Sequence, residues 1–197
     1  DGTFQSKSHP VRVTGISGTV ASIAAGNWHS LASTTDGNVW AWGFNERGQL
    51  GIGRVRESRS AIRVSGLPGV RTVAAGAAYS LVLATNGTVW SWGENIYGQL
   101  GDGTTVDRAT PARIAALSDI VAISAHAWNG LALDASGRVW SWGYGGWGQL
   151  GDGTTSNRST PFVVPGLPRI RSVRAGNRIS VAIADDGSVW MWGSNDA

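Results

Sequence analysis

The sequence predicts an all-β chain made of four copies of one unit. A Val-Trp pair recurs every 50 residues, beginning at Val39, Val89, Val139 and Val189. Glycine-rich turns recur in step with it, including GQLG at 48–51, 98–101 and 148–151. No apolar period of 3.6 residues persists over three turns, so no amphipathic helix is expected. We expect a single domain over residues 1–197, with repeats at roughly 1–51, 52–101, 102–151 and 152–197.

Each copy predicts four short strands. In the second copy we expect three strands at residues 70–74, 80–84 and 88–92, and a fourth at 111–115 after the long glycine-rich loop. Gly76 interrupts the first two runs, and Asn86-Gly87 has the composition of a tight hairpin turn. Trp90 and Trp92 are two residues apart and therefore lie on one face of their strand. Four strands per unit that are apolar on both faces predict a β-propeller blade, packed between two neighbouring blades.

The two ends of the chain lack parts of a blade. Asp1-Gly2-Thr3 corresponds to Asp102-Gly103-Thr104 and so follows a missing GQLG, and the chain stops before another. A strand expected near Pro10 to Val13 then has no blade of its own, and the last blade lacks its outer strand. An unpaired strand edge favours pairing with a strand from another chain or another blade. Two alternatives stay open: a two-fold homodimer with strand exchange that forms an eight-bladed ring, or a piece of a larger propeller. A closed four-bladed monomer is disfavoured, because each blade would turn by about 90°.

Composition excludes several classes of site. The chain has no Cys, so it has no disulfide, no thiolate zinc site and no cysteine nucleophile. Its formal charge of +3 is too small to indicate nucleic-acid binding. The chain contains no run of 18 apolar residues, so no membrane-spanning helix is expected. The three His residues form no metal-ligand motif, so we expect no catalytic residue, no metal and no cofactor. The compartment stays unassigned.

The motifs of the first copy, AAG…HSLA…DGNVWAWG…GQLG, resemble the regulator of chromosome condensation repeat family. The similarity extends over essentially all 197 residues. It implies a propeller, typically of seven blades, that acts as an interaction platform. This tryptophan-rich form is most similar to bacterial members. The resemblance also implies that His29 is a structural hydrogen-bonding residue near the central channel.

Comparison of the copies separates structural from variable positions. The repeated tryptophans are expected in the blade cores, at Trp40, Trp42, Trp90, Trp92, Trp140, Trp142, Trp190 and Trp192. Variable positions fall in inner turns (27–29, 77–79, 127–129, 177–179) and outer loops (44–47, 94–97, 144–147), which we expect on one face. The residues predicted to bind a partner there are Trp28, His29, Phe44, Arg47, Tyr79, Tyr97, Trp128, Tyr144, Trp147 and Arg178.

Trp, Tyr and Arg are the residues that most often anchor protein interfaces. The sequence therefore predicts a non-catalytic scaffold that binds a macromolecular partner, most simply a protein. One alternative is a carbohydrate-binding lectin, because exposed rings can stack on sugars. Another is a self-assembling repeat without a ligand. In the third copy, His126 replaces a repeated Gly and Gly130 replaces a repeated Ser, which predicts a bend of different shape.

Overall fold

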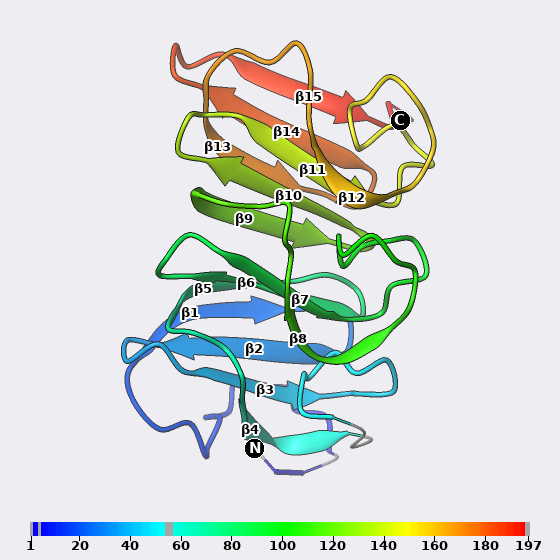
Figure 1. Ribbon diagram of the computed structural model, residues 1–197. Helices are drawn as coiled ribbons and strands as arrows, with labels where there is room; N and C mark the ends of the chain where they lie inside the picture. The colour runs from blue at the N-terminus through cyan, green and yellow to red at the C-terminus, as the bar shows by residue number, and fades with distance from the viewer. Residues whose placement is uncertain (1, 4, 54–56, 196–197) are drawn as a thin grey trace.

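The computed structural model describes residues 2–3, 5–53 and 57–195 (Figure 1). These residues form fifteen strands in four antiparallel sheets and no helix. The described chain thus has no helix long and apolar enough to cross a membrane. The all-β class predicted from the sequence is confirmed.

Each sheet is one blade with its strands in chain order. The first blade consists of β1 (Val20–Ala25), β2 (His29–Thr34), β3 (Val39–Gly43) and β4 (Ser58–Val64). The second consists of β5 (Val70–Ala75), β6 (Tyr79–Ala84), β7 (Val89–Gly93) and β8 (Arg108–Arg113). The third consists of β9 (Ile120–His126), β10 (Asn129–Asp134), β11 (Val139–Gly143) and β12 (Arg158–Val163). The fourth consists of β13 (Ile170–Ala175), β14 (Ile179–Ala184) and β15 (Val189–Gly193).

The strands that follow the long loops, β4, β8 and β12, complete the outside of the blade before them, as the sequence predicts. The fourth blade has three described strands and lacks this outer strand, also as predicted. The first strands of successive blades pack beside one another, from β1 to β5, β9 and β13. The sheets are therefore stacked face to face in the manner of propeller blades.

Three apolar cores hold the blades together, one at each junction. The junction between the first two blades contains Leu31 and Val39 against Val73 and Trp92. Equivalent clusters join the second blade to the third and the third to the fourth. Burial of these side chains at every junction explains why the strands are apolar on both faces.

The repeated GQLG turn adds a hydrogen bond to each junction. The indole nitrogens of Trp92, Trp142 and Trp192 donate to carbonyl oxygens of the preceding blade, at Gln49, Gln99 and Gln149, over 2.8, 2.9 and 2.8 Å. A buried indole N–H needs such an acceptor. These tryptophans and turns are therefore structural, as their repetition indicates.

The four blades form an open arc. The first and fourth blades lie at opposite ends of the molecule (Figure 1). Their outward faces leave apolar side chains exposed, with Ile23 75% and Val189 68% accessible. The strand predicted near Pro10 to Val13 is not formed, and these residues run outside the sheets. The pattern of a strand is present there, but these residues belong to none of the four sheets of the described chain.

Candidate protein-binding site on the loop face

The inner turns and outer loops lie side by side at one end of each blade. β2 begins at His29, which is paired with Gly43 at the end of β3, and the same register recurs in the other blades. Beyond each pair a backbone bond joins the turn to the loop. Phe44 N donates to Trp28 O over 2.8 Å, and Tyr144 N donates to Trp128 O over 2.9 Å. We call this surface the loop face; it comprises residues 27–29, 77–79, 127–129 and 177–179 and residues 44–47, 94–97 and 144–147.

The glutamine of each GQLG turn holds the backbone of the outer loop at the position of a variable residue. Gln99 Oε1 accepts a hydrogen bond from the backbone of Tyr97 over 2.9 Å, and Gln149 does the same for Trp147. In the second blade, Asn95 Oδ1 also accepts from Leu100 N over 2.9 Å. The variable residue thus projects from a loop whose backbone is held by a glutamine hydrogen bond that repeats from blade to blade. Such pre-organisation lowers the entropic cost of binding.

Four of the predicted residues form one aromatic cluster, which consists of Tyr97, Trp128, Tyr144 and Trp147. Ring centroids are 4.8 Å apart for Tyr97 and Tyr144, 4.9 Å for Tyr144 and Trp147, and 5.7 Å for Tyr97 and Trp128. These pairs meet edge to face, at interplanar angles of 62–70°. All four rings are partly exposed. The cluster bridges the second and third blades.

A cation extends this cluster onto the fourth blade. The Arg178 guanidinium lies over the Trp147 ring, 4.6 Å from its centroid, and the Arg178 side chain remains exposed. Arginine over an indole face is a favourable cation–π arrangement. At both of these junctions the outer loop of one blade therefore contacts the inner turn of the next, through Tyr97 and Trp128 and then through Trp147 and Arg178.

At the other end of the loop face Arg47 makes ion pairs across the first junction. Arg47 Nε is 3.7 Å from Glu94 Oε1, and Arg47 Nη1 is 3.3 Å from Asp107 Oδ2. Gln99 Nε2 donates to Glu94 Oε2 over 3.2 Å. Burial raises the pKa of the Glu94 carboxyl group, and the charge of Arg47 acts in the opposite direction. Glu94 and Asp107 were not among the predicted residues, although Glu94 occupies a variable loop position that could have suggested it.

The inner turn of the third blade differs in shape, as predicted from His126 and Gly130. β9 continues to His126, which is paired with Asn129, and only Ala127 and Trp128 form the turn. Ala127 has a φ of 38°, which is unusual for a residue with a side chain. This shorter turn carries Trp128, the residue that contacts Tyr97.

Two predicted residues are buried, and their expected place on the surface is wrong. His29 is 3% exposed, and its Nε2 lies 3.0 Å from Ser80 Oγ of the next blade. Tyr79 is fully buried, and its hydroxyl donates to Asn129 O over 2.5 Å. Both side chains point into the junction between blades rather than out of the turn, so neither can contact a partner.

Two further predicted residues belong to the first blade and lie outside the aromatic cluster. Trp28 is 71% exposed. Phe44 is half-buried and lines a separate cavity of about 270 Å³ together with Trp42 and Arg59. The predicted set therefore divides into a cluster with Arg178, the ion-paired Arg47, two isolated aromatics and two buried residues.

Burial of His29 predicts a pH-dependent stability. Desolvation lowers the pKa of His29 from 6.5 to about 4, so the folded chain keeps it neutral where the unfolded chain binds a proton. The free energy of unfolding is therefore highest above pH 6.5. It falls as the pH decreases from 6.5 towards 4, because His29 then binds a proton in the unfolded chain but not in the folded chain. Between pH 7.5 and 5.5 the free energy of unfolding should fall by about 1 kcal/mol from this group.

Urea unfolding at the two pH values measures this effect. In His29→Gln the decrease should be smaller by that amount, and in His126→Gln, which changes an exposed histidine, it should match the wild type. An unchanged pH dependence in His29→Gln would show that His29 is not the group responsible.

The RCC1-like domain model matches residues 1–197, the whole chain. The chain belongs to the RCC1-like domain family. The family resemblance drawn from the repeats is thereby confirmed. The crystal structure of human WBSCR16 matches this RCC1-like chain with a TM-score of 0.84 and 25% identity, covering 94% of this chain and 50% of that one.

The crystal structure of Prp20p from Saccharomyces cerevisiae, described with its binding properties to Gsp1p and histones, matches with a TM-score of 0.79 and 28% identity. That match covers 93% of this chain and 48% of Prp20p. The probable E3 ubiquitin-protein ligase HERC3 of Homo sapiens is 43% identical over 53 residues, 26% of this chain and 5% of HERC3. This RCC1-like chain thus spans about half of the solved propellers and a small part of the ligase.

Proposed function

We propose that this RCC1-like chain is a non-catalytic scaffold that binds a protein partner through the aromatic cluster and Arg178. The observation that carries the proposal is the convergence of four rings and a cation from three blades. These side chains occupy positions that differ between copies, whereas the residues holding the loops repeat. Large rings with arginine, partly exposed and held on a fixed backbone, are typical of the energetic centres of protein interfaces.

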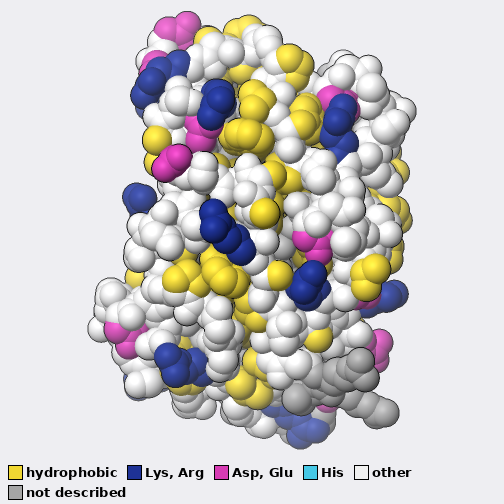
Figure 2. Space-filling model, in the orientation of Figure 1, with side chains coloured by type: hydrophobic (Ala, Val, Ile, Leu, Met, Phe, Trp, Pro, Cys, Tyr) yellow, Lys and Arg dark blue, Asp and Glu magenta, His cyan; other side chains and the backbone are white. Residues whose placement is uncertain are grey.

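The family relatives support a protein as the partner. Prp20p is described with its binding properties to Gsp1p and histones, and yeast RCC1 (Prp20) is described bound to Kap60. The distribution of charge on this chain does not favour binding of a polyanion such as a nucleic acid. On the side of the molecule shown in Figure 2, the Lys and Arg side chains are scattered singly and Asp and Glu lie among them. Nucleic-acid binding usually requires a continuous basic surface.

A carbohydrate is the less favoured ligand, for a geometric reason. Stacking on a sugar needs a ring with one open face. In the aromatic cluster the closest rings meet edge to face, and Arg178 already covers one face of Trp147. Other rings and Arg178 thus already contact ring faces that a sugar would need, which makes a carbohydrate the less favoured ligand.

Selection from a displayed protein and peptide library, followed by affinity measurement on variants, tests the proposal. Binders selected on the wild-type chain should bind Trp147→Ala at least about 30-fold more weakly, the loss of roughly 2 kcal/mol that a central interface tryptophan causes. Trp147 is partly exposed, so the variant should keep its fold, which near-ultraviolet circular dichroism can verify.

Val163→Ala is the matched control, because Val163 is 37% exposed and is paired with Trp140 at the opposite end of the third blade. Affinities within twofold of the wild type are expected for this control. Equal affinities for Trp147→Ala and Val163→Ala would refute the proposed site. Binding to a glycan array that Trp147→Ala abolishes, without any protein binder, would instead favour the lectin alternative.

A further inference from the structure

Glu94 is an acid at a position where the neighbouring copies have an aromatic residue. Phe44 and Tyr144 occupy the equivalent positions in the first and third copies. The backbone N–H of Glu94 donates to Ala78 O over 2.9 Å, and the two aromatic residues make the same bond in their own blades. Glu94 is nevertheless 9% exposed. A carboxylate that is buried to this extent has to be held by donors around it.

Partners from three blades meet the Glu94 carboxylate. Gln99 Nε2, from the same blade, donates to Glu94 Oε2 over 3.2 Å. Arg47 Nε, from the first blade, is 3.7 Å from Glu94 Oε1. The indole N–H of Trp128, from the inner turn of the third blade, also donates to this carboxylate. All three partners present N–H groups, and an ionised carboxylate presents only acceptors, so one side chain satisfies all of them.

Two of these partners support rings of the aromatic cluster. Trp128 is itself one of the four rings, and its centroid lies 5.7 Å from that of Tyr97. Gln99 uses its other side-chain atom, Oε1, to accept from Tyr97 N over 2.9 Å. Glu94 is thus bonded directly to one ring of this pair, and it is bonded through a single glutamine to the backbone of the other.

The first blade shows the same loop without the acid. Gln49 is equivalent to Gln99, and its Oε1 accepts from Arg47 N over 3.0 Å. Its Nε2 is buried and has no hydrogen-bond partner within the described chain. Phe44, at the position of Glu94, offers no acceptor. The glutamine of the first blade is therefore held at one end of its amide group, whereas Gln99 is held at both.

We propose that Glu94 is a positioning residue, which holds Tyr97 and Trp128 in their edge-to-face arrangement before a partner binds. The role rests on the proposed function and adds to it a residue that acts through the rings rather than by touching the partner. Rings that are fixed in advance lose less entropy on binding. In Glu94→Gln an amide N–H would face one of the surrounding donors, so this nearly isosteric change should loosen the pair.

Titration of Glu94 gives this role a spectroscopic signature. Burial raises the pKa of the Glu94 carboxyl group; the charge of Arg47 and the hydrogen bond from Trp128 lower it, and the charge of Asp107 raises it. Protonation turns one acceptor oxygen into a donor, which changes the surroundings of the Trp128 indole N–H. Each tryptophan has one indole N–H and gives one indole ¹⁵N–¹H resonance, so Trp128→Phe identifies the resonance of Trp128.

The Trp128 resonance should move with pH, with a midpoint above 4.5, the ordinary pKa of glutamate. All chains carry His126→Gln, so that the histidine two residues away adds no titration of its own. Glu94→Gln should displace the resonance at pH 7 and abolish the transition. Glu46→Gln is the matched control, because it makes the same change at an exposed residue of the neighbouring outer loop, and it should keep the transition. A transition that persists in Glu94→Gln overturns the proposal.

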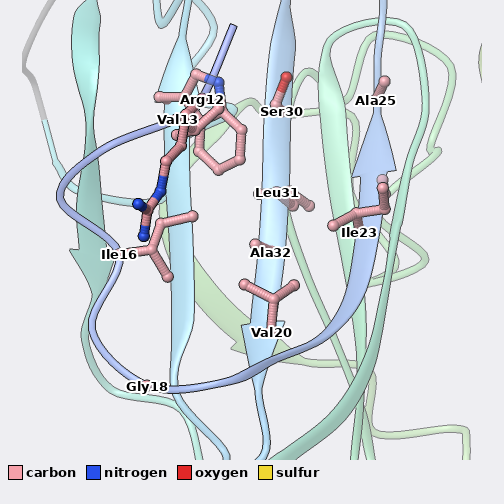
Figure 3. Close-up of a pocket in the computed structure, with 12 residues that line it drawn as sticks. Arg12, Val13, Ile16, Gly18, Val20, Ile23, Ala25, Ser30, Leu31 and Ala32 are labelled. Atoms are coloured by element: carbon pink, nitrogen blue, oxygen red, sulfur yellow. The ribbon is translucent and has the colours of Figure 1, made fainter. Parts of the chain in front are cut away.

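The role in binding is measured on the selected protein binders, after those that use another apolar surface have been set aside. A cavity of about 520 Å³ lies beside the first blade, between residues 12–16 and strands β1 and β2 (Figure 3). Ile23 lines this cavity and is 75% exposed. Binders whose affinity falls in Ile23→Asp use the cavity and are excluded from the comparison.

The remaining binders should bind Glu94→Gln about 10-fold more weakly than the wild type and Glu46→Gln within twofold of it. Equal affinities for Glu94→Gln and the wild type overturn the positioning role. The proposed function fails by a different result, which is an unchanged affinity for Trp147→Ala. The transition of the Trp128 resonance is measured without any partner, so it tests the contact with Glu94 whichever way the binding experiment ends.

Discussion

Replacement of Trp142 by alanine is expected to lower the free energy of unfolding by about 3–5 kcal/mol. Trp142 is fully buried in the junction between the second and third blades. Its removal leaves a large cavity, and Gln99 O loses the indole donor that lies 2.9 Å away. Trp142 lies between two hydrogen-bonded sheets, and these sheets are too rigid to collapse into the space that it leaves.

Urea unfolding followed by far-ultraviolet circular dichroism measures this loss. Trp140→Ala is the matched control, because Trp140 is on the same strand but partly exposed. Its indole donates to the side chain of Asp134 over 3.0 Å. This variant should lose less than half as much stability. Similar losses for the two variants would mean that burial at the junction is not what makes Trp142 important.

Replacement of Gly143 by alanine is the second large expected effect, at least about 3 kcal/mol of destabilisation. Gly143 has a φ of 98°, in a region that residues with a Cβ avoid. A Cβ atom there would also overlap the carbonyl oxygen of Trp128 and lie 3.0 Å from the Cα of Asn129. Both obstacles are backbone atoms, so a change of side-chain rotamer cannot relieve the contact.

Gly153→Ala separates the two causes of that effect. Gly153 has a φ of 77°, but a Cβ atom there would meet nothing within 4 Å. The control should therefore lose only the backbone term, about 1 kcal/mol. Chemical denaturation of both variants gives the comparison. If Gly153→Ala were as unstable as Gly143→Ala, the close approach of turn and loop at Trp128 would not be the source of the penalty.

The blade architecture was predictable because it rests on repetition. The Val-Trp pairs and the hairpin glycines recur in all four blades, and GQLG recurs at the three junctions between them. The three strands described for the fourth blade, against four in each of the others, also followed from counting motifs. The aromatic cluster was predictable in part, since Tyr97, Trp128, Tyr144 and Trp147 occupy variable loop positions.

Other features depend on contacts that no single copy contains. His29 and Tyr79 vary between copies, yet they vary because each is fitted to the next blade, through Ser80 and through the backbone of Asn129. The ion pairs of Arg47 with Glu94 and Asp107 depend on how closely adjacent loops approach across a junction. The segment at Pro10 to Val13 has a strand pattern, but none of the described sheets includes it.

The separation of the apolar interior into three clusters, one for each junction, makes the chain a one-dimensional array. Each inner blade shares two junctions and each end blade shares one, so the total stability is close to a sum over neighbours. A further blade would contribute one more neighbour interaction without rearranging those already present, so an array of this kind can lengthen by duplication of a single unit.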